Sequence, residues 1–91
     1  MPAAARPAWQ VYILECADHS LYTGIARDAD ARLAVHNRGC GARYTRSRLP
    51  VRLVYVEPAA DRGQALRREA AIRRLGTMGK RALVRGASKG E

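Results

Sequence analysis

The stretch "VYILECADHSLYTG", residues 11–24, predicts a β-hairpin, and this hairpin decides the fold. β-Branched and aromatic residues fill both halves, and the polar cluster "ADHS" between them is typical of a turn. Strand alternation places Tyr12 on one face with Leu14 and Cys16, and Tyr22 on the same face as Gly24. Since Gly24 has no side chain, we expect a ligand to be able to approach the backbone there. The hairpin holds two of the four tyrosines of a chain without Phe, so they are either core residues or phenols with a chemical role.

The rest of the chain predicts one further strand and three helices. Aspartates at 28, 30 and 61 are N-cap candidates, and Gln64 completes a variant of the capping box with Asp61. The segment "RGCGARYTRSRLP" is a loop by its local signals, and Pro58 is expected to end the third strand. The pattern predicts a three-stranded sheet covered by helices, which is an α/β (α+β) domain of order β-β-α-β-α-α. After the hairpin we expect a helix over 28–37, a loop over 38–50, a strand over 51–57, a helix over 61–75 and a short last helix over 76–85.

The 91 residues suffice for one small domain. We expect an N-terminal tail over 1–8, a domain over 9–85 and a flexible C-terminal tail over 86–91. The apolar runs are too short for a membrane span, and the start is too short in apolar residues for a signal peptide. These features predict a cytoplasmic protein, and a location at the nucleoid also fits them.

The chain is strongly basic, with a formal net charge of +9 and a pI near 10.8. Such a surface attracts polyanions by counterion release, and nucleic acid is the commonest intracellular polyanion. The alternative is a solvated basic face, because 15 arginines against 2 lysines also fit a composition set by a GC-rich genome.

The two cysteines, Cys16 and Cys40, lack the C-x-x-C spacing. An intracellular chain keeps such thiols reduced. Together with His19 and His36 they could supply four zinc ligands, but a full strand separates the two halves of that set.

Glu69 stands out on the helix predicted over 61–75. Helical spacing places it between Ala65 and Ile72, inside an apolar arc that Leu66 and Ala70 complete. A carboxylate in a core-facing arc costs energy unless a partner compensates it. The alternative is an exposed glutamate that pairs with Arg73 one turn later.

The chain carries five residues whose order resembles the GIY-YIG nuclease family, in its small single-domain bacterial branch: Tyr12, Tyr22, Arg32, His36 and Glu69. Val11-Tyr12-Ile13 resembles the first motif and Tyr22-Thr23-Gly24 the second, and Arg32 follows Tyr22 by ten residues, as the family's helix arginine does. His36 resembles the histidine one turn later, and Glu69 in "ALRREAAI" the metal-binding glutamate. The stretch from His36 to Thr45 is similar to the "HN-x-G…GA-x-Y-T" pattern of that branch.

The resemblance implies a metal-dependent endonuclease with a small, mostly antiparallel three-stranded sheet. This hydrolase would cut DNA phosphodiester bonds in DNA repair, directed by structure or damage, with little sequence specificity. It implies catalytic roles for Tyr12, Tyr22, Arg32, His36 and Glu69, with Glu69 binding one Mg²⁺ or Mn²⁺ ion. The basic patch expected to contact nucleic acid, most often DNA, comprises Arg27, Arg43, Tyr44, Arg46 and Arg48.

Three departures from the family pattern leave other functions open. Gln10 replaces the glycine of the first motif, Ile25 stands where some members carry lysine, and the one asparagine, Asn37, does not match the C-terminal asparagine of other members. The alternatives are a non-catalytic nucleic-acid-binding module with the same fold and an interaction subunit of a DNA-repair complex. A protein partner or a homodimer is expected to supply targeting, since one small domain carries no separate reader.

Overall fold

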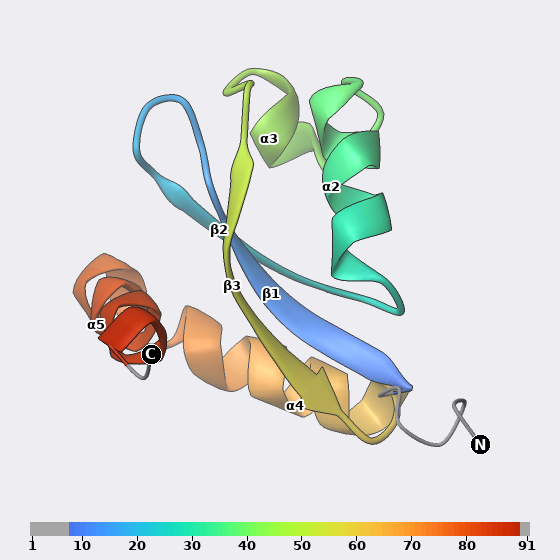
Figure 1. The fold of residues 1–91 in the computed structure, drawn as a ribbon, viewed down its shortest axis with the longest axis vertical. Helices are drawn as coiled ribbons and strands as arrows, with labels where there is room; N and C mark the ends of the chain where they lie inside the picture. The colour runs from blue at the N-terminus through green and yellow to red at the C-terminus, as the bar shows by residue number, and fades with distance from the viewer. Residues whose placement is uncertain (1–7, 90–91) are drawn as a thin grey trace.

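A computed structural model describes residues 8–89 of the chain. The hairpin forms as predicted, with β1 (Trp9–Glu15) antiparallel to β2 (Leu21–Ala26). The third strand, β3 (Arg52–Ala59), pairs antiparallel with β1, so the sheet order is β2-β1-β3. Figure 1 shows this sheet between two layers of helices.

Helix α2 (Ala29–Asn37) and the one-turn helix α3 (Arg43–Arg46) cover one face of the sheet, and α4 (Arg62–Arg73) and α5 (Gly76–Lys89) cover the other (Figure 1). The predicted caps form: the Asp28 carboxylate accepts from the amide of Ala31, and the Asp61 carboxylate from that of Gln64. The α+β class and the antiparallel sheet are therefore confirmed.

Two predicted details of the secondary structure are wrong. The loop predicted over 38–50 contains α3, which begins after Ala42 because the Ala42 carbonyl accepts from the amides of Thr45 and Arg46. Strand β3 continues through Pro58, which an edge strand tolerates because its outer side needs no ladder hydrogen bonds.

The expected boundary at residue 85 lies within α5, which continues to Lys89. The expected N-terminal tail lies almost wholly outside the described residues. No helix of the part that the structure describes is long and apolar enough to cross a membrane.

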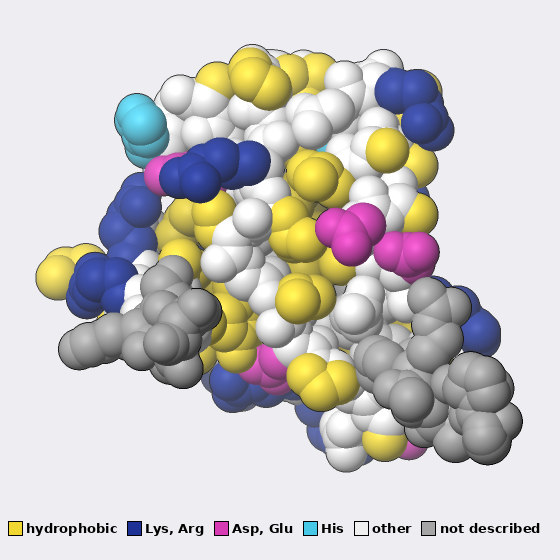
Figure 2. All heavy atoms as spheres, viewed as in Figure 1, with side chains coloured by type: hydrophobic (Ala, Val, Ile, Leu, Met, Phe, Trp, Pro, Cys, Tyr) yellow, Lys and Arg dark blue, Asp and Glu magenta, His cyan; other side chains and the backbone are white. Residues whose placement is uncertain are grey.

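Strand alternation divides the core into two clusters. Val11 and Ile13 pack toward α4, against Ala65 and Ile72. Tyr12, Leu14 and Cys16 share the opposite face, as the strand alternation predicted, and Tyr22 packs on that face too. Figure 2, seen from the same side as Figure 1, shows hydrophobic side chains across the middle of the visible surface and most Lys and Arg toward its edges.

Candidate active site

Tyr12 lies across the neighbouring strand instead of pointing straight away from the sheet. Its partner in the register is Gly24, and a Cβ atom at Gly24 would lie 2.6 Å from the Tyr12 Oη and 3.1 Å from the Tyr22 ring. The space expected to admit a ligand at Gly24 is therefore filled by the phenol of Tyr12. The missing side chain lets this phenol reach the edge of the sheet over β2.

A chain of hydrogen bonds runs from Tyr12 into α2 and α3. The Tyr12 hydroxyl lies 3.0 Å from His36 Nε2, and His36 Nδ1 lies 2.9 Å from Thr45 Oγ1. The Thr45 hydroxyl donates its proton to the Ala42 carbonyl at 2.9 Å, so it can only accept from Nδ1. His36 is therefore protonated on Nδ1, and its Nε2 accepts the proton of the Tyr12 hydroxyl.

His36 is fully buried, with 0% of its surface exposed, although it lies in the last turn of α2. Gly41 makes this possible, because a Cβ there would lie 2.2 Å from His36 Nδ1. Sequence reasoning missed Gly41 and Thr45 as parts of the site. The "GA-x-Y-T" half of the pattern from His36 to Thr45 contains both residues and was the signal that could have revealed them.

The electrostatics of the site oppose an unassisted phenolate. The pKa of Tyr12 is raised to about 12, first by burial and then by the phenol of Tyr22. A hydrogen bond from Arg32 and its positive charge act in the lowering direction, and the negative charge of Glu69 raises the pKa further. The pKa of His36 lies below its usual range because burial and the charge of Arg32 disfavour the imidazolium. Tyr12 is thus protonated and His36 neutral at pH 7.

Arg32 and Glu69 therefore act electrostatically on one phenol, although they come from helices on opposite faces of the sheet. Arg32 is exposed, whereas the Glu69 side chain is only 15% exposed. Glu69 combines features of the two alternatives, because its carboxylate is turned inward and also pairs with Arg73 at 3.2 Å. The prediction of an apolar arc around it is wrong at two residues, since Leu66 and Ala70 face solvent while Ala65 and Ile72 are buried.

Tyr22 joins a second aromatic group at the surface. Its ring centroid lies 5.5 Å from that of His36 in an edge-on arrangement and 6.1 Å from that of Tyr44 in a stacked one. The Arg48 guanidinium covers the Tyr44 ring at 3.9 Å and donates to the Asp18 carboxylate at 3.1 Å. Tyr22 thus bridges the buried hydrogen-bonded chain and an exposed aromatic patch.

The predicted basic patch is divided among three places. Arg43 and Arg46 are exposed on α3, and Arg48 is engaged by Asp18 and Tyr44. Arg27 lies apart from these, stacked on Trp9 with its guanidinium carbon 5.2 Å from the ring centroid.

Two of the three departures from the family pattern have structural roles here. The Gln10 side chain accepts a hydrogen bond of 2.7 Å from the amide of Ala29, the first residue of α2. The Asn37 side chain both donates to and accepts from the backbone of Val51, which fixes the end of α2 beside β3. These contacts hold the helix that carries Arg32 and His36.

The donor set limits which metal the site could hold. No cluster of three or more His, Cys, Asp or Glu side chains suited to a metal ion occurs within residues 8–89. Both ring nitrogens of His36 have hydrogen-bond partners, so it does not fit the zinc set with Cys16, His19 and Cys40. The inward Glu69 carboxylate fits a Mg²⁺ or Mn²⁺ ion that keeps most of its waters.

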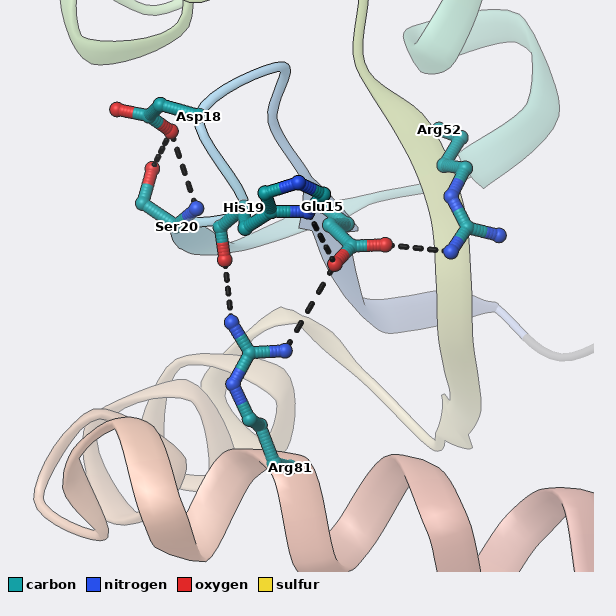
Figure 3. A network of polar contacts seen from close by, with 6 residues as sticks. All are labelled: Glu15, Asp18, His19, Ser20, Arg52 and Arg81. Atoms are coloured by element: carbon teal, nitrogen blue, oxygen red, sulfur yellow. Dashed lines mark hydrogen bonds and ion pairs between the residues drawn. The ribbon is translucent and has the colours of Figure 1, made fainter.

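A second polar network lies away from this site, at the turn of the hairpin (Figure 3). The Glu15 carboxylate pairs there with Arg52 of β3 and, at 3.7 Å, with Arg81 of α5. Arg81 also donates to the backbone carbonyl of His19. This network ties α5 to the hairpin and shares no residue with the candidate site.

Comparisons with known proteins agree with this geometry. The family model of the GIY-YIG catalytic domain matches residues 8–80. The chain is 52% identical over 90 residues to UPF0213 protein DP2720 of Desulfotalea psychrophila, covering 98% of this chain and 82% of the relative. A UPF0213 protein of Staphylococcus aureus strain Mu3 is 54% identical over 63 residues, covering 69% and 77% respectively.

A solved structure is also similar. The solution NMR structure of UPF0213 protein BH0048 from Bacillus halodurans matches with a TM-score of 0.54 and 43% identity, over 84% of this chain and 81% of that one. With the family model matching most of the chain, the protein belongs to the GIY-YIG nuclease family.

Proposed function

We propose that this protein is a metal-dependent endonuclease that hydrolyses phosphodiester bonds of DNA, directed by DNA structure or damage. One observation carries the proposal: the buried phenol of Tyr12 is hydrogen-bonded to the neutral, buried His36, whose other ring nitrogen is held by Thr45. A nucleic-acid binder without catalysis has no need of a buried proton acceptor behind a phenol.

The proton path follows from the assigned tautomer. An attacking water gives its proton to the Tyr12 oxygen while the Tyr12 proton passes to His36 Nε2, so the phenol stays neutral throughout. This relay avoids forming a free phenolate from a group whose pKa is about 12. The imidazolium that results keeps its hydrogen bond to Thr45.

The remaining residues would bind and orient the phosphate. Arg32 is exposed beside the phenol and suits a cationic clamp on the scissile phosphate, and the Tyr22 hydroxyl suits a hydrogen bond to a phosphate oxygen. Glu69 would hold the divalent ion, which when bound neutralises the phosphate and its leaving oxygen. Arg73, exposed and one turn from Glu69, can leave that carboxylate at little cost.

The test is a panel of linear, branched, flapped and single-stranded DNA, incubated with and without Mg²⁺ or Mn²⁺. We expect metal-stimulated cleavage, most of it on branched or flapped DNA, by the parent protein. Glu69→Gln should abolish cleavage. Glu57→Gln, which removes a carboxylate from the edge strand β3, should cut like the parent. Equal cleavage by the parent and Glu69→Gln would contradict the proposal.

The second candidate is a nucleic-acid-binding module that retains the fold without catalysis. The raised pKa of Tyr12 and the absence of a lysine at Ile25 favour it. It predicts salt-sensitive binding of nucleic acid with no cleavage on any substrate of the panel.

A further inference from the structure

A groove of about 360 Å³ lies beside the candidate site and is not part of it. Trp9 and Ile25 of the sheet line it, together with Arg27 and the α2 residues Arg32 and Val35. Arg32 is the one candidate catalytic residue among them, so the groove opens directly next to the proposed position of the scissile phosphate. Asp28 also lines it, but its carboxylate accepts from the Ala31 amide as the helix cap.

The groove combines an apolar wall with arginines at its rim. The Trp9 ring is only partly buried, and the guanidinium carbons of Arg27 and Arg62 lie 5.2 Å and 6.0 Å from its centroid. A cation over an exposed indole contributes only about 0.5–1 kcal/mol. A flat aromatic ligand can therefore displace either guanidinium from the indole and leave it free to bind a phosphate.

This chemistry selects an unpaired nucleotide as the ligand. Nucleobases stack on aromatic side chains regardless of sequence, and arginines beside the aromatic group follow the sugar-phosphate backbone. The volume is at the low end of the range of small-ligand pockets, and stacking on Trp9 requires a base whose face is open. The chain's net charge of +9 complements such a ligand.

We propose that this groove binds the unpaired nucleotide next to the scissile phosphate, with its base against Trp9 and its phosphates between Arg27 and Arg32. The inference rests on the proposed function, and it specifies the substrate as DNA with a single-stranded segment beside the cut. Within a duplex both faces of each base are covered by the neighbouring base pairs, so an interior base has no face open to Trp9.

The single tryptophan of the chain provides a direct readout. The fluorescence of Trp9 is titrated in the Glu69→Gln protein, so that no substrate is cut, with oligothymidylate and with a blunt duplex of the same length. We expect saturable quenching by the single strand and much less by the duplex. Arg27→Ala should weaken single-strand binding and reduce its salt dependence by about one phosphate contact, whereas Arg85→Ala, which removes an exposed arginine on α5, should bind like the parent.

Trp9→Leu separates stacking from folding, because leucine retains apolar packing at the end of β1. With an end-labelled oligothymidylate and anisotropy as the readout, this variant should lose affinity about 5- to 150-fold while its circular dichroism stays native. Binding of the labelled strand without quenching, or equal quenching by duplex, would overturn the groove assignment. Quenching by single strands with no cleavage of any substrate by the parent would instead contradict the proposed function and leave the groove as a binding site.

Discussion

Two polar networks connect the β1–β2 hairpin to other elements of the fold, and they differ in burial and charge. The first, made of Tyr12, His36 and Thr45, is buried and uncharged. The second, centred on Glu15, is charged, and its arginines Arg52 and Arg81 have 74% and 40% of their side chains exposed (Figure 3). The first lies at the candidate active site and the second at the turn, on the side of α5.

The difference shows where the structure is sensitive to substitution. Water can replace a lost partner in the exposed network, whereas a buried donor or acceptor that loses its partner bears the full cost of desolvation. A buried chain therefore holds one geometry, which a proton relay requires.

The largest effect is expected for His36→Gln, measured as the rate of DNA cleavage at saturating metal. Loss of a proton acceptor lowers the rate about 10²- to 10⁴-fold. The parent's rate should also fall at acid pH, with a midpoint below 6.5, because the pKa of His36 is lowered and only its neutral form accepts the proton. A His36→Gln protein that retains the parent's rate and pH profile would remove His36 from the mechanism.

The same lowered pKa affects stability with a definite sign. The unfolded chain binds a proton on this histidine near pH 6.5 that the folded chain does not bind. The free energy of unfolding therefore decreases as pH falls from about 6.5 to the folded-state pKa, and levels off below it. Urea unfolding between pH 5 and 8 should show this decrease in the parent and not in His36→Gln.

The next largest effect is expected for Gly41→Ala, because the new Cβ would lie 2.2 Å from His36 Nδ1. Over-packing of this kind typically costs about 1–3 kcal/mol, and we expect that decrease in the free energy of unfolding in urea. Gly86→Ala is the matched control, because nothing lies within 4 Å of a Cβ there and alanine favours a helix. If both variants unfold at the same urea concentration as the parent, the close approach at Gly41 is not what holds His36.

Thr45→Val is expected to cost about 1–3 kcal/mol, because the isosteric methyl leaves the His36 Nδ1 proton without an acceptor. Cleavage should fall with it, and Thr45→Ser should restore both stability and rate by restoring the hydroxyl. Thr77→Val, at an exposed position of α5, controls for the loss of a hydroxyl alone. Failure of serine to rescue the rate would mean that Thr45 acts by packing and not through the imidazole.

The smallest effect is expected for Arg81→Ala in the charged network. An exposed ion pair contributes about 0–1 kcal/mol, so the free energy of unfolding should change by no more than that and cleavage should be unaffected. High salt should reduce the difference further. A larger loss than for Thr45→Val would reverse the ranking of the two networks.

Local patterns in the sequence were enough to predict the framework of the site. Strand alternation and a turn cluster predicted the hairpin and the common face of Tyr12, Leu14 and Cys16, and the structure confirms both. Capping signals predicted the starts of α2 and α4, which carry Arg32, His36 and Glu69.

The parts that were missed depend on tertiary contacts. Helix α3 is a single turn whose place is set by the bond between Thr45 and His36, nine residues apart. The roles of Gly24 and Gly41 depend on rings that approach from elsewhere in the fold. The raised pKa of Tyr12 results from its burial and its neighbours, which a strand pattern does not encode.

The central claim, that these side chains form one phosphodiester-cleavage centre, is tested most directly by the cleavage rate of a flapped DNA. The parent and Glu69→Gln are purified in parallel and assayed with Mn²⁺ or Mg²⁺, and then with EDTA. We predict cleavage by the parent that requires metal, and none by Glu69→Gln although it binds the same DNA with similar affinity. Cleavage by Glu69→Gln at the parent's rate, or none by either protein on any substrate, would contradict the claim.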